Sequence, residues 1–350
     1  MKILAVQGSP RPRMSNTERL LREFLRGAED EGAATETVYL KEKEIHPCQG
    51  CYTCWMKTPG TCVFKDDMPE LLEKVRACDV IVYATPLYNY NVTALLKAFQ
   101  ERLLPLADPH LVKEGDTYRH PSRYQQKRKM VLVSNCGFPE VSHFDGLKAV
   151  FGLSAKQGGV PLVGQILLPA GELIKQEVFR PRLKPVFEAV YRAGVELVRN
   201  GGVSAETETI IQTPIMHADD MASMANLSWD SLIEAKGSAL NPGKIKDMRL
   251  LLRGMAATFN PEAAGDLEGV IQFHVTGAQP GNWYLSMKKG ACVMAEGEAE
   301  APSLTITTPS DVWLGVANRE MDGQRAFMEG KYTAQGDIAL LMRMNSLFGG

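Results

Sequence analysis

The first 200 residues alternate between short apolar runs and segments whose apolar residues recur at helical spacing. The expected strands lie at 2–7, 36–40, 80–84, 130–134 and 161–168. Each run has the length of a buried strand, and turn residues such as Gly8-Ser9-Pro10 and Thr85-Pro86 close two of them. Strands that alternate with helices pair in parallel through right-handed crossovers. This half of the chain therefore predicts a doubly wound α/β domain.

The segments between these runs predict the helices of that domain. They are expected at 16–32, 66–75, 95–103 and 182–199. Asn16 is the expected N-cap of the first helix, and Gly32 is its expected stop. The polar segment 108–127 is expected to be irregular.

From about residue 240 the pattern changes to short strands that follow one another. They are expected at 269–277, 283–287, 291–295 and 303–307. Helical patterns follow at 311–319 and after Gly336. Consecutive strands with helices at the ends predict a smaller α+β domain with an antiparallel sheet. We therefore expect domains at 1–200 and 241–350, joined by a connecting segment at 201–240.

The segment Gly8 to Thr17 joins the first strand to the first helix. Open α/β sheets bind ligands at the carboxyl ends of their strands, and a helix N-terminus offers free N–H groups to a phosphate. The segment lacks the Gly-x-Gly-x-x-Gly pattern and the Walker A pattern. It therefore favours a mononucleotide such as FMN over a dinucleotide or a nucleoside triphosphate. The alternative is a polar turn with an ordinary N-cap.

A cluster of cysteines follows the second strand. Its members are Cys48, Cys51, Cys54 and Cys62. Three cysteines at steps of three can turn their thiolates toward one centre, and the turn at Pro59-Gly60 can bring back the fourth. Four thiolates suit a [4Fe–4S] cluster or zinc. The last gap is longer than in the ferredoxin pattern, so free or redox-active thiols are the third alternative. Cys78 and Cys292 are expected as small core residues.

Charge and hydropathy exclude some classes of partner. The net charge of −2 gives no reason to expect nucleic acid or an anionic membrane surface. No stretch approaches the roughly 18 apolar residues of a membrane span, and the apolar run after Met1 is too short for a signal peptide. The sequence therefore predicts a cytoplasmic protein, with its cysteines in a reducing compartment.

Four motifs follow one another in the first half of the chain. They are Gly8-Ser-Pro-Arg with Ser15-Asn-Thr, Cys48-x-x-Cys51-x-x-Cys54-Trp55, Cys62-x-x-x-Asp66-Asp67-Met68, and Thr85-Pro86-Leu87-Tyr88. In this order they resemble the NADPH-dependent FMN reductase family and the related iron–sulfur flavoproteins. The resemblance covers about residues 1–200 and implies a flavodoxin-like fold, bound FMN, NAD(P)H as reductant, and a homodimer or a pair of dimers.

The resemblance also implies which residues hold the cofactor. It assigns the phosphate to Ser9, Arg11, Ser15, Asn16 and Thr17, the isoalloxazine ring to Pro86, Leu87, Tyr88 and Asn89, and a third flavin loop to Asn135, Cys136 and Gly137. No catalytic side chain is expected, because FMN itself accepts the hydride. The implied function is an NAD(P)H-dependent flavin or quinone-type reductase. The alternative is an iron–sulfur flavoprotein that relays electrons between protein partners.

The last 110 residues carry a second resemblance. The stretches 311–319, 326–331 and 335–341, with the strands expected before them, resemble the sterol carrier protein 2 (SCP2) family. That family implies an apolar tunnel for a lipid, so the electron acceptor is expected to be a quinone or another apolar molecule. A third hypothesis is a lipid-binding module with the first half as scaffold. The candidate lining residues, which can equally form a packed core, are Phe259, Phe273, Leu285, Trp313, Phe327 and Met328.

Overall fold

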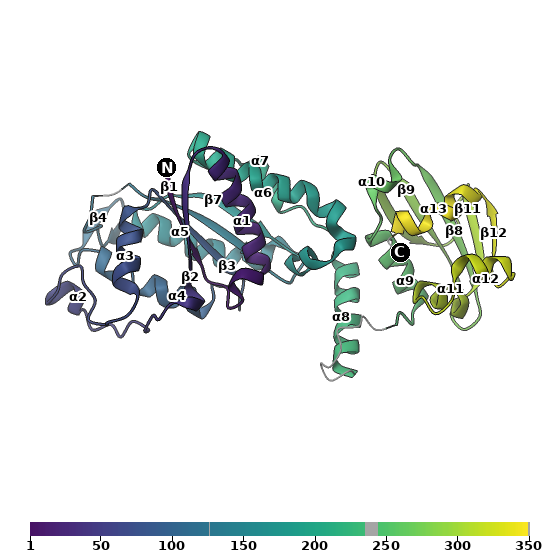
Figure 1. Ribbon diagram of the computed structural model, residues 1–350, viewed down its shortest axis with the longest axis horizontal. Helices are drawn as coiled ribbons and strands as arrows, with labels where there is room; N and C mark the ends of the chain where they lie inside the picture. Colours follow the sequence, from purple (N-terminus) through teal and green to yellow (C-terminus); the bar gives the residue numbers. More distant parts are fainter. Residues whose placement is uncertain (126, 235–243, 349–350) are drawn as a thin grey trace. The chain divides into compact units, whose positions relative to one another are not determined.

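The computed structural model describes residues 1–125, 127–234 and 244–348 (Figure 1). The chain divides into two compact units. Unit 1 comprises residues 1–175 and 183–214, and unit 2 comprises residues 176–182 and 215–350. Each unit is described by itself below.

The centre of unit 1 is a parallel sheet of five strands. The strands are β1 (Lys2–Gln7), β2 (Ala34–Tyr39), β3 (Val80–Pro86), β6 (Lys129–Asn135) and β7 (Leu162–Leu168). Their order is β2-β1-β3-β6-β7, and every neighbouring pair is parallel. This is the strand order of the flavodoxin-like fold. The predicted doubly wound sheet is confirmed.

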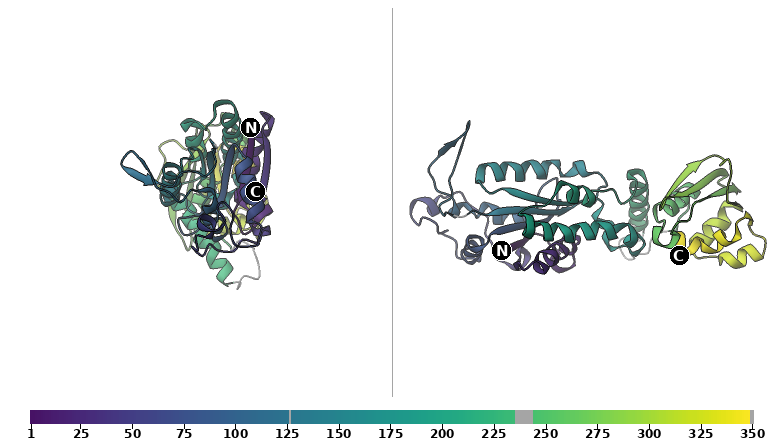
Figure 2. Two further views of the ribbon diagram at one scale, coloured as in Figure 1. Left: turned by 90° about the vertical axis from the view of Figure 1, so that its left-hand side faces the viewer. Right: turned by 90° about the horizontal axis from the view of Figure 1, so that it is seen from above.

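Helices cover both faces of this sheet. They are α1 (Asn16–Asp30), α3 (Met68–Ala77), α4 (Ala94–Glu101), α5 (Asp145–Gly158) and α6 (Arg180–Asn200), of which α6 belongs to unit 1 from Leu183 onward. Apolar side chains of α3, α4 and α5 form one core with alternate residues of the strands, such as Leu4, Ile81 and Leu132. Purple α1 lies on the opposite side of the sheet from α5 (Figure 2).

Two local predictions in unit 1 are wrong. The N-cap of α1 is Ser15 rather than Asn16: Ser15 has an extended backbone, and its hydroxyl accepts a hydrogen bond from the Glu18 N–H at 3.0 Å. The segment expected to be irregular contains a hairpin, formed by β4 (Val112–Glu114) and β5 (Thr117–Arg119). Its strands are three residues long and largely exposed, so they lack the apolar pattern that identifies a strand.

Helices α1 and α6 pack closely because each has a glycine at the contact. A Cβ atom on Gly27 would lie 2.0 Å from the Tyr191 carbonyl oxygen, and one on Gly194 would lie 2.0 Å from the Phe24 carbonyl oxygen. Both obstacles are backbone atoms of a helix, which cannot move aside as a flexible side chain can. The distance between the helices therefore depends on these two residues.

We expect Gly194→Ala to lower the free energy of unfolding by at least about 2 kcal/mol, because the added methyl group forces the two helices apart. Gly152→Ala in α5 is the matched control, since no heavy atom lies within 4 Å of a Cβ there. The control should raise stability by about 0.5–1 kcal/mol. Urea unfolding measures both, and equal effects would contradict the packing account.

Unit 2 contains a second sheet of five strands. They are β8 (Gly269–Thr276), β9 (Gly281–Lys288), β10 (Ala291–Glu296), β11 (Leu304–Pro309) and β12 (Thr333–Gly336), in the order β10-β9-β8-β11-β12. The prediction of an antiparallel sheet is wrong at one pair, because β11 runs parallel to β8. The chain between β10 and β11 crosses back past β9 and β8. The buried Gln272 side chain holds this crossover, donating to Gly297 O and accepting from Ala299 N.

The helices of unit 2 pack on its sheet or on one another. Helices α9 (Met248–Ala257), α11 (Ser310–Ala317) and α13 (Ile338–Phe348) contact strands of the sheet. Helix α8 (Ala218–Glu234) packs on α9, α10 (Pro261–Ala264) packs on α13, and α12 (Gly323–Met328) contributes Ala326 to the buried cluster. Residues 201–240, expected as a connecting segment, also include α7 (Ala205–Ile211), which packs on β7. Within the described ranges, no helix has both the length and the apolar composition needed to cross a bilayer.

The apolar residues expected inside unit 2 are not all buried. Phe259, Phe273, Leu285 and Trp313 belong to one buried cluster, and Phe327 packs at its edge. Met328 is 79% exposed, so the expectation that it lines the interior is wrong. It ends the short helix α12, and the sequence pattern does not show which face of so short a helix is buried.

The two cysteines expected in the cores differ in burial. Cys78 is buried in the core of unit 1, as predicted. Cys292 is only half-buried and packs at the edge of the unit 2 cluster, because it lies on the edge strand β10.

Candidate functional site

Two pockets lie in unit 1, and each collects residues that the sequence singled out. We call the first the strand-end pocket, because loops after β1, β3, β6 and β7 form it. Its lining residues are Ser9, Arg11, Ser15, Asn16, Thr17, Pro86, Leu87, Tyr88, Asn135, Cys136, Gly137 and Glu172. All the residues expected to hold a flavin therefore line one pocket, except Asn89. Glu172 is an addition.

The first loop of the strand-end pocket is held by its backbone. The N–H of Gly8 donates to Ala84 O at 2.8 Å, and the Thr93 hydroxyl donates to Gly8 O at 2.6 Å. A Cβ on Gly8 would lie 2.8 Å from the Leu96 Cβ, so a larger residue would displace the loop. Ser9 follows with its N–H donating to the Gln7 side chain at 2.6 Å. The loop is therefore fixed before α1 begins.

Polar atoms at the start of α1 are buried in this pocket. The Asn135 amide donates to the Thr17 hydroxyl at 2.7 Å, which joins the loop after β6 to the helix N-terminus. The Asn16 Oδ1 atom is buried and has no hydrogen-bond partner within the described residues. A buried acceptor without a partner costs free energy unless a ligand or water satisfies it. Together with the positive end of the helix dipole, these groups fit a ligand with a phosphate and hydroxyl groups.

The second loop forms a tight turn after β3. The backbones of Tyr88 and Asn91 exchange two hydrogen bonds of 3.0 Å, and Leu87 N donates to Asn135 O at 2.9 Å. Asn89 and Tyr90 at the tip have positive φ angles of 48° and 62°, which non-glycine residues adopt at a cost. Asn89 therefore lies at the tip of the turn, while Leu87 and Tyr88 line the pocket.

The third loop contains a thiol that packs rather than reacts. Cys136 is buried, and its Sγ donates to Phe138 O at 3.3 Å. Burial raises the pKa of this thiol to about 11, so it stays protonated near neutral pH. It can shape the pocket, but it offers no thiolate nucleophile.

Sequence reasoning missed Glu172. It follows β7, the one strand end for which no ligand contact was expected. The preceding residue, Gly171, packs closely against Asn135: a Cβ atom at Gly171 would lie only 2.7 Å from Asn135 Oδ1. The signal was available in principle: a Gly-Glu pair directly after a fifth parallel strand lies at the same edge of the sheet as the other loops.

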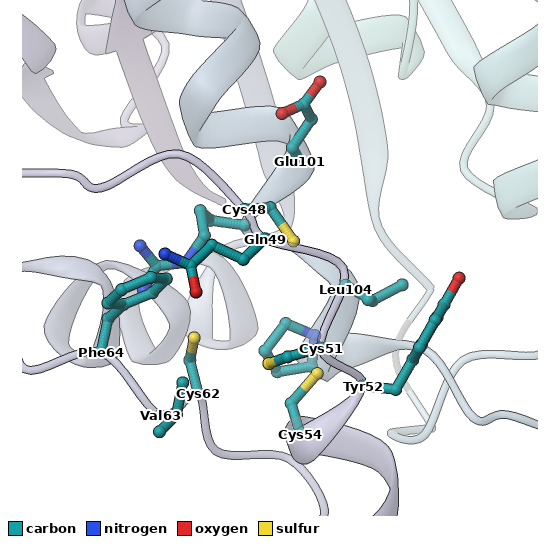
Figure 3. Close-up of a pocket in the computed structure, with 12 residues that line it drawn as sticks. Cys48, Gln49, Cys51, Tyr52, Cys54, Cys62, Val63, Phe64, Glu101 and Leu104 are labelled. Atoms are coloured by element: carbon teal, nitrogen blue, oxygen red, sulfur yellow. The ribbon is translucent and has the colours of Figure 1, made fainter.

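The second pocket, which we call the cysteine pocket, lies between the cysteine loop and the end of α4 (Figure 3). Cys48, Cys51, Cys54 and Cys62 all line it, together with Gln49, Tyr52, Val63, Phe64, Glu101, Arg102, Leu104 and Pro105. Cys54 belongs to the short helix α2 (Thr53–Met56), and the other three cysteines lie in the loops on either side. The expected gathering of the four cysteines is therefore observed.

The four sulfur atoms do not converge on one ion. Within the described residues, no three side chains of histidine, cysteine, aspartate or glutamate form a group that could hold a metal ion. The pKa values of the thiols also diverge: hydrogen bonding with Thr53 lowers the pKa of Cys51, whereas burial and the neighbouring Cys62 raise that of Cys54. Four cysteine thiols are the ligand set of an iron–sulfur cluster. In this structure, however, they are not grouped closely enough to hold one metal ion together.

A buried ion pair supports the cysteine pocket. Arg102 Nη1 and Nη2 donate to the two oxygens of Asp66 at 2.6 and 3.1 Å, and the two side chains are 1% and 0% exposed. Burial by itself would raise the pKa of Asp66. Hydrogen bonds from Arg102 and from the N–H groups of His46 and Met68 lower it by more, so the pKa lies below its usual range. Asp66 is therefore ionised near neutral pH.

We expect Asp66→Asn to lower the free energy of unfolding by about 3–5 kcal/mol at neutral pH, because it leaves a buried guanidinium unpaired. Since the pKa of Asp66 is lowered by folding, its contribution is complete above its unfolded pKa of about 3.9 and is lost as the pH falls through the folded value. The stability difference between wild type and variant should therefore shrink below about pH 4.

Asp67→Asn is the matched control for this measurement. Asp67 accepts one hydrogen bond from the Glu44 N–H at 2.7 Å, whereas Arg102 pairs with Asp66. Denaturant unfolding between neutral and acidic pH distinguishes the two variants. A pH-independent difference for Asp66→Asn, or an equal loss for both variants, would contradict the account.

Both units match known families, each over its own segment. Residues 1–128 match the family of NADPH-dependent FMN reductases, and residues 250–349 match the SCP-2 sterol transfer family. The two resemblances noted from the sequence are therefore confirmed for these segments. Unit 1 thus combines a flavodoxin-like fold with the reductase family's sequence pattern.

Among curated proteins, the chain is similar to iron–sulfur flavoproteins of several archaea. It is 42% identical over 106 residues to one from Methanocaldococcus jannaschii, which is 30% of this chain and 53% of that protein. It is 41% identical over 105 residues to one from Archaeoglobus fulgidus, which is 30% of this chain and 46% of that protein. The chain thus spans about half the length of the curated relatives it matches.

Among solved structures, the chain is similar to an FMN-dependent NADH-azoreductase from Bacillus anthracis in complex with FMN. It is 13% identical, with a TM-score of 0.44, and the match covers 57% of this chain and 99% of that one.

Proposed function

We propose that unit 1 is an NAD(P)H-dependent FMN oxidoreductase and that the strand-end pocket holds FMN. The observation that carries this proposal is the buried, unpartnered Asn16 Oδ1 at a helix N-terminus, surrounded by hydroxyl groups in a pocket formed by strand ends. The family match over residues 1–128 supports it. When bound, FMN accepts a hydride and donates one or two electrons.

The residues of the chain bind and orient the cofactor in this proposal. Ser9, Ser15 and Thr17 present hydroxyl groups beside the N–H groups of α1, and Arg11 adds a positive charge. Asn135 orients the Thr17 hydroxyl through their hydrogen bond. The loops that contain Pro86–Tyr88 and Asn135–Gly137 flank the place of the ring. The protonated Cys136 thiol would line the flavin site without acting as a nucleophile.

We expect Arg11→Ala to raise the Kd for FMN about 10-fold or more, because a hydrogen bond to a charged group is worth about 1.5–3 kcal/mol. Arg13→Ala is the matched control: Arg13 lies two residues further on, pairs with Glu42 and lies over the Tyr39 ring, outside the pocket. Fluorescence titration of the apoprotein with FMN measures both. Equal effects, or no saturable binding by the wild type, would contradict the proposal.

A second candidate is an iron–sulfur flavoprotein that relays electrons between protein partners. The observation that favours it is the single pocket lined by Cys48, Cys51, Cys54 and Cys62. Two curated relatives that match about 30% of the chain carry this name. Cys48, Cys51, Cys54 and Cys62 would hold a [4Fe–4S] cluster, which supplies one-electron transfer when bound. Iron and sulfide in the anaerobically purified protein, with reduction by a ferredoxin-like donor rather than NAD(P)H, would favour this candidate.

We further propose that unit 2 binds an apolar molecule, such as a lipid or a quinone that accepts electrons from unit 1. The family match over residues 250–349 supports it, and so does the apolar cluster around Phe273 and Trp313. A ligand of this class would have to enter between side chains that pack together here, as in other apolar sites whose lining resembles a core.

We expect the intact protein to bind a fluorescent fatty acid saturably and to yield a lipid or quinone on organic extraction. Mass spectrometry of the extract identifies the ligand. Displacement of the fluorescent fatty acid by this ligand tests whether the two bind at the same site. If the protein is yellow and reducible by NADPH but does not bind such probes saturably, the proposed role of unit 2 is contradicted while that of unit 1 is not. A colourless protein with bound lipid would instead favour a lipid-binding module with a scaffold.

A further inference from the structure

Arg102 has an unusual position for a cation. Among the residues that the structure describes, it is the only lysine or arginine that is buried, at 1% exposure. It follows the last residue of α4 and lines the cysteine pocket. Removing a guanidinium from water is costly, so its position requires compensating partners.

The partners of Arg102 connect both ends of the cysteine loop. Nη1 donates to the His46 carbonyl at 2.7 Å, just before Cys48, and both Nη atoms donate to Asp66, just after Cys62. The guanidinium also lies 4.9 Å from the centroid of the Phe64 ring. One side chain at the end of α4 therefore fixes where the cysteine loop leaves the domain and where it returns.

These partners do not use the guanidinium fully. The Asp66 carboxylate also accepts hydrogen bonds from the N–H groups of His46 and Met68, at 3.0 and 3.1 Å, so its negative charge is shared with other donors. The Nε atom of Arg102 is buried and has no hydrogen-bond partner within the described part of the chain. A positive charge and an unused donor thus remain at the wall of a pocket that contains four thiols.

We propose that Arg102 is a positioning residue of the cysteine pocket: it holds the cysteine loop and compensates the negative charge of four thiolates gathered around one centre. This inference rests on the second candidate function. Four thiolates around a [4Fe–4S] core leave a net negative charge, which grows by one unit on reduction. A cation at the wall stabilises the reduced form more than the oxidised form and raises the reduction potential. Asp66 keeps Arg102 in place.

The test uses the full chain, reconstituted anaerobically with iron and sulfide. Arg102→Gln should lower the midpoint potential of the cluster and speed its loss to a chelator several-fold. Arg102→Lys, which keeps the charge but not the paired hydrogen bonds, should retain most of the potential and lose the cluster faster than wild type. The control is Arg76→Gln, which changes a half-buried arginine that pairs with Glu73, lies over the Tyr124 ring and is absent from the pocket lining; it should change neither quantity.

A double variant distinguishes the effect of the Arg102 charge on the cluster from the destabilisation that an unpaired buried charge would cause. Arg102→Met with Asp66→Leu removes both buried charges together, a change that proteins often tolerate. We expect it to bind FMN as the wild type does and to lower the midpoint potential by less than Arg102→Gln does, because the negative charge of Asp66 is removed together with the positive charge. A wild-type potential and chelation rate in the double variant would overturn the inference while leaving the cluster in place. A wild type without iron and sulfide after reconstitution would overturn the cluster and, with it, the inference, but not FMN binding.

Discussion

Parallel pairing of β1, β3 and β6 brings their carboxyl ends to one edge of the sheet, and the rest of unit 1 depends on that register. Gln7 pairs with Ala84, and Pro86 pairs with Asn135. Backbone hydrogen bonds then tie the loops together directly beyond the strands, from Gly8 to Ala84 and from Leu87 to Asn135. A slip by one residue would move every side chain of a strand to the opposite face of the sheet, where different side chains are packed. The packing on both faces therefore fixes the register of the strands and, with it, the positions of the loops.

Helix α4 connects the two pockets of unit 1. At its start, the N-cap Thr93 donates to the Gly8 carbonyl in the first loop of the strand-end pocket. Just beyond its end, Arg102 pairs with Asp66 at the wall of the cysteine pocket. The same helix thus supports the first loop of the strand-end pocket at one end and the four thiols of the cysteine pocket at the other. A flavin and a sulfur-based centre in one domain would both depend on its position.

Strand periodicity and loop chemistry were sufficient to predict much of unit 1. Every strand of its sheet was expected within about two residues. The buried strands β1, β3, β6 and β7 are largely continuous apolar runs, whereas the edge strand β2 is only partly buried. The strand-end pocket followed from topology, since parallel strands end at one edge. Topology places Glu172 at the same edge of the sheet, but only the close packing of Gly171 against Asn135, a tertiary contact, shows that Glu172 lines the pocket. Arg102 was missed for the same reason: its partners lie 36 and 56 residues away.

Unit 2 was harder to predict from local patterns. Each strand carried a signal, but the parallel pairing of β8 with β11 depends on a crossover held by Gln272, which propensities do not encode. The central claim is the proposal that unit 1 is an NAD(P)H-dependent FMN oxidoreductase, and an anaerobic titration of the FMN-loaded protein with NADPH tests it most directly. We predict that about one equivalent of NADPH per bound flavin bleaches its visible absorption, as expected for a two-electron transfer. A bound flavin that stays oxidised with excess NADPH and NADH would contradict the claim.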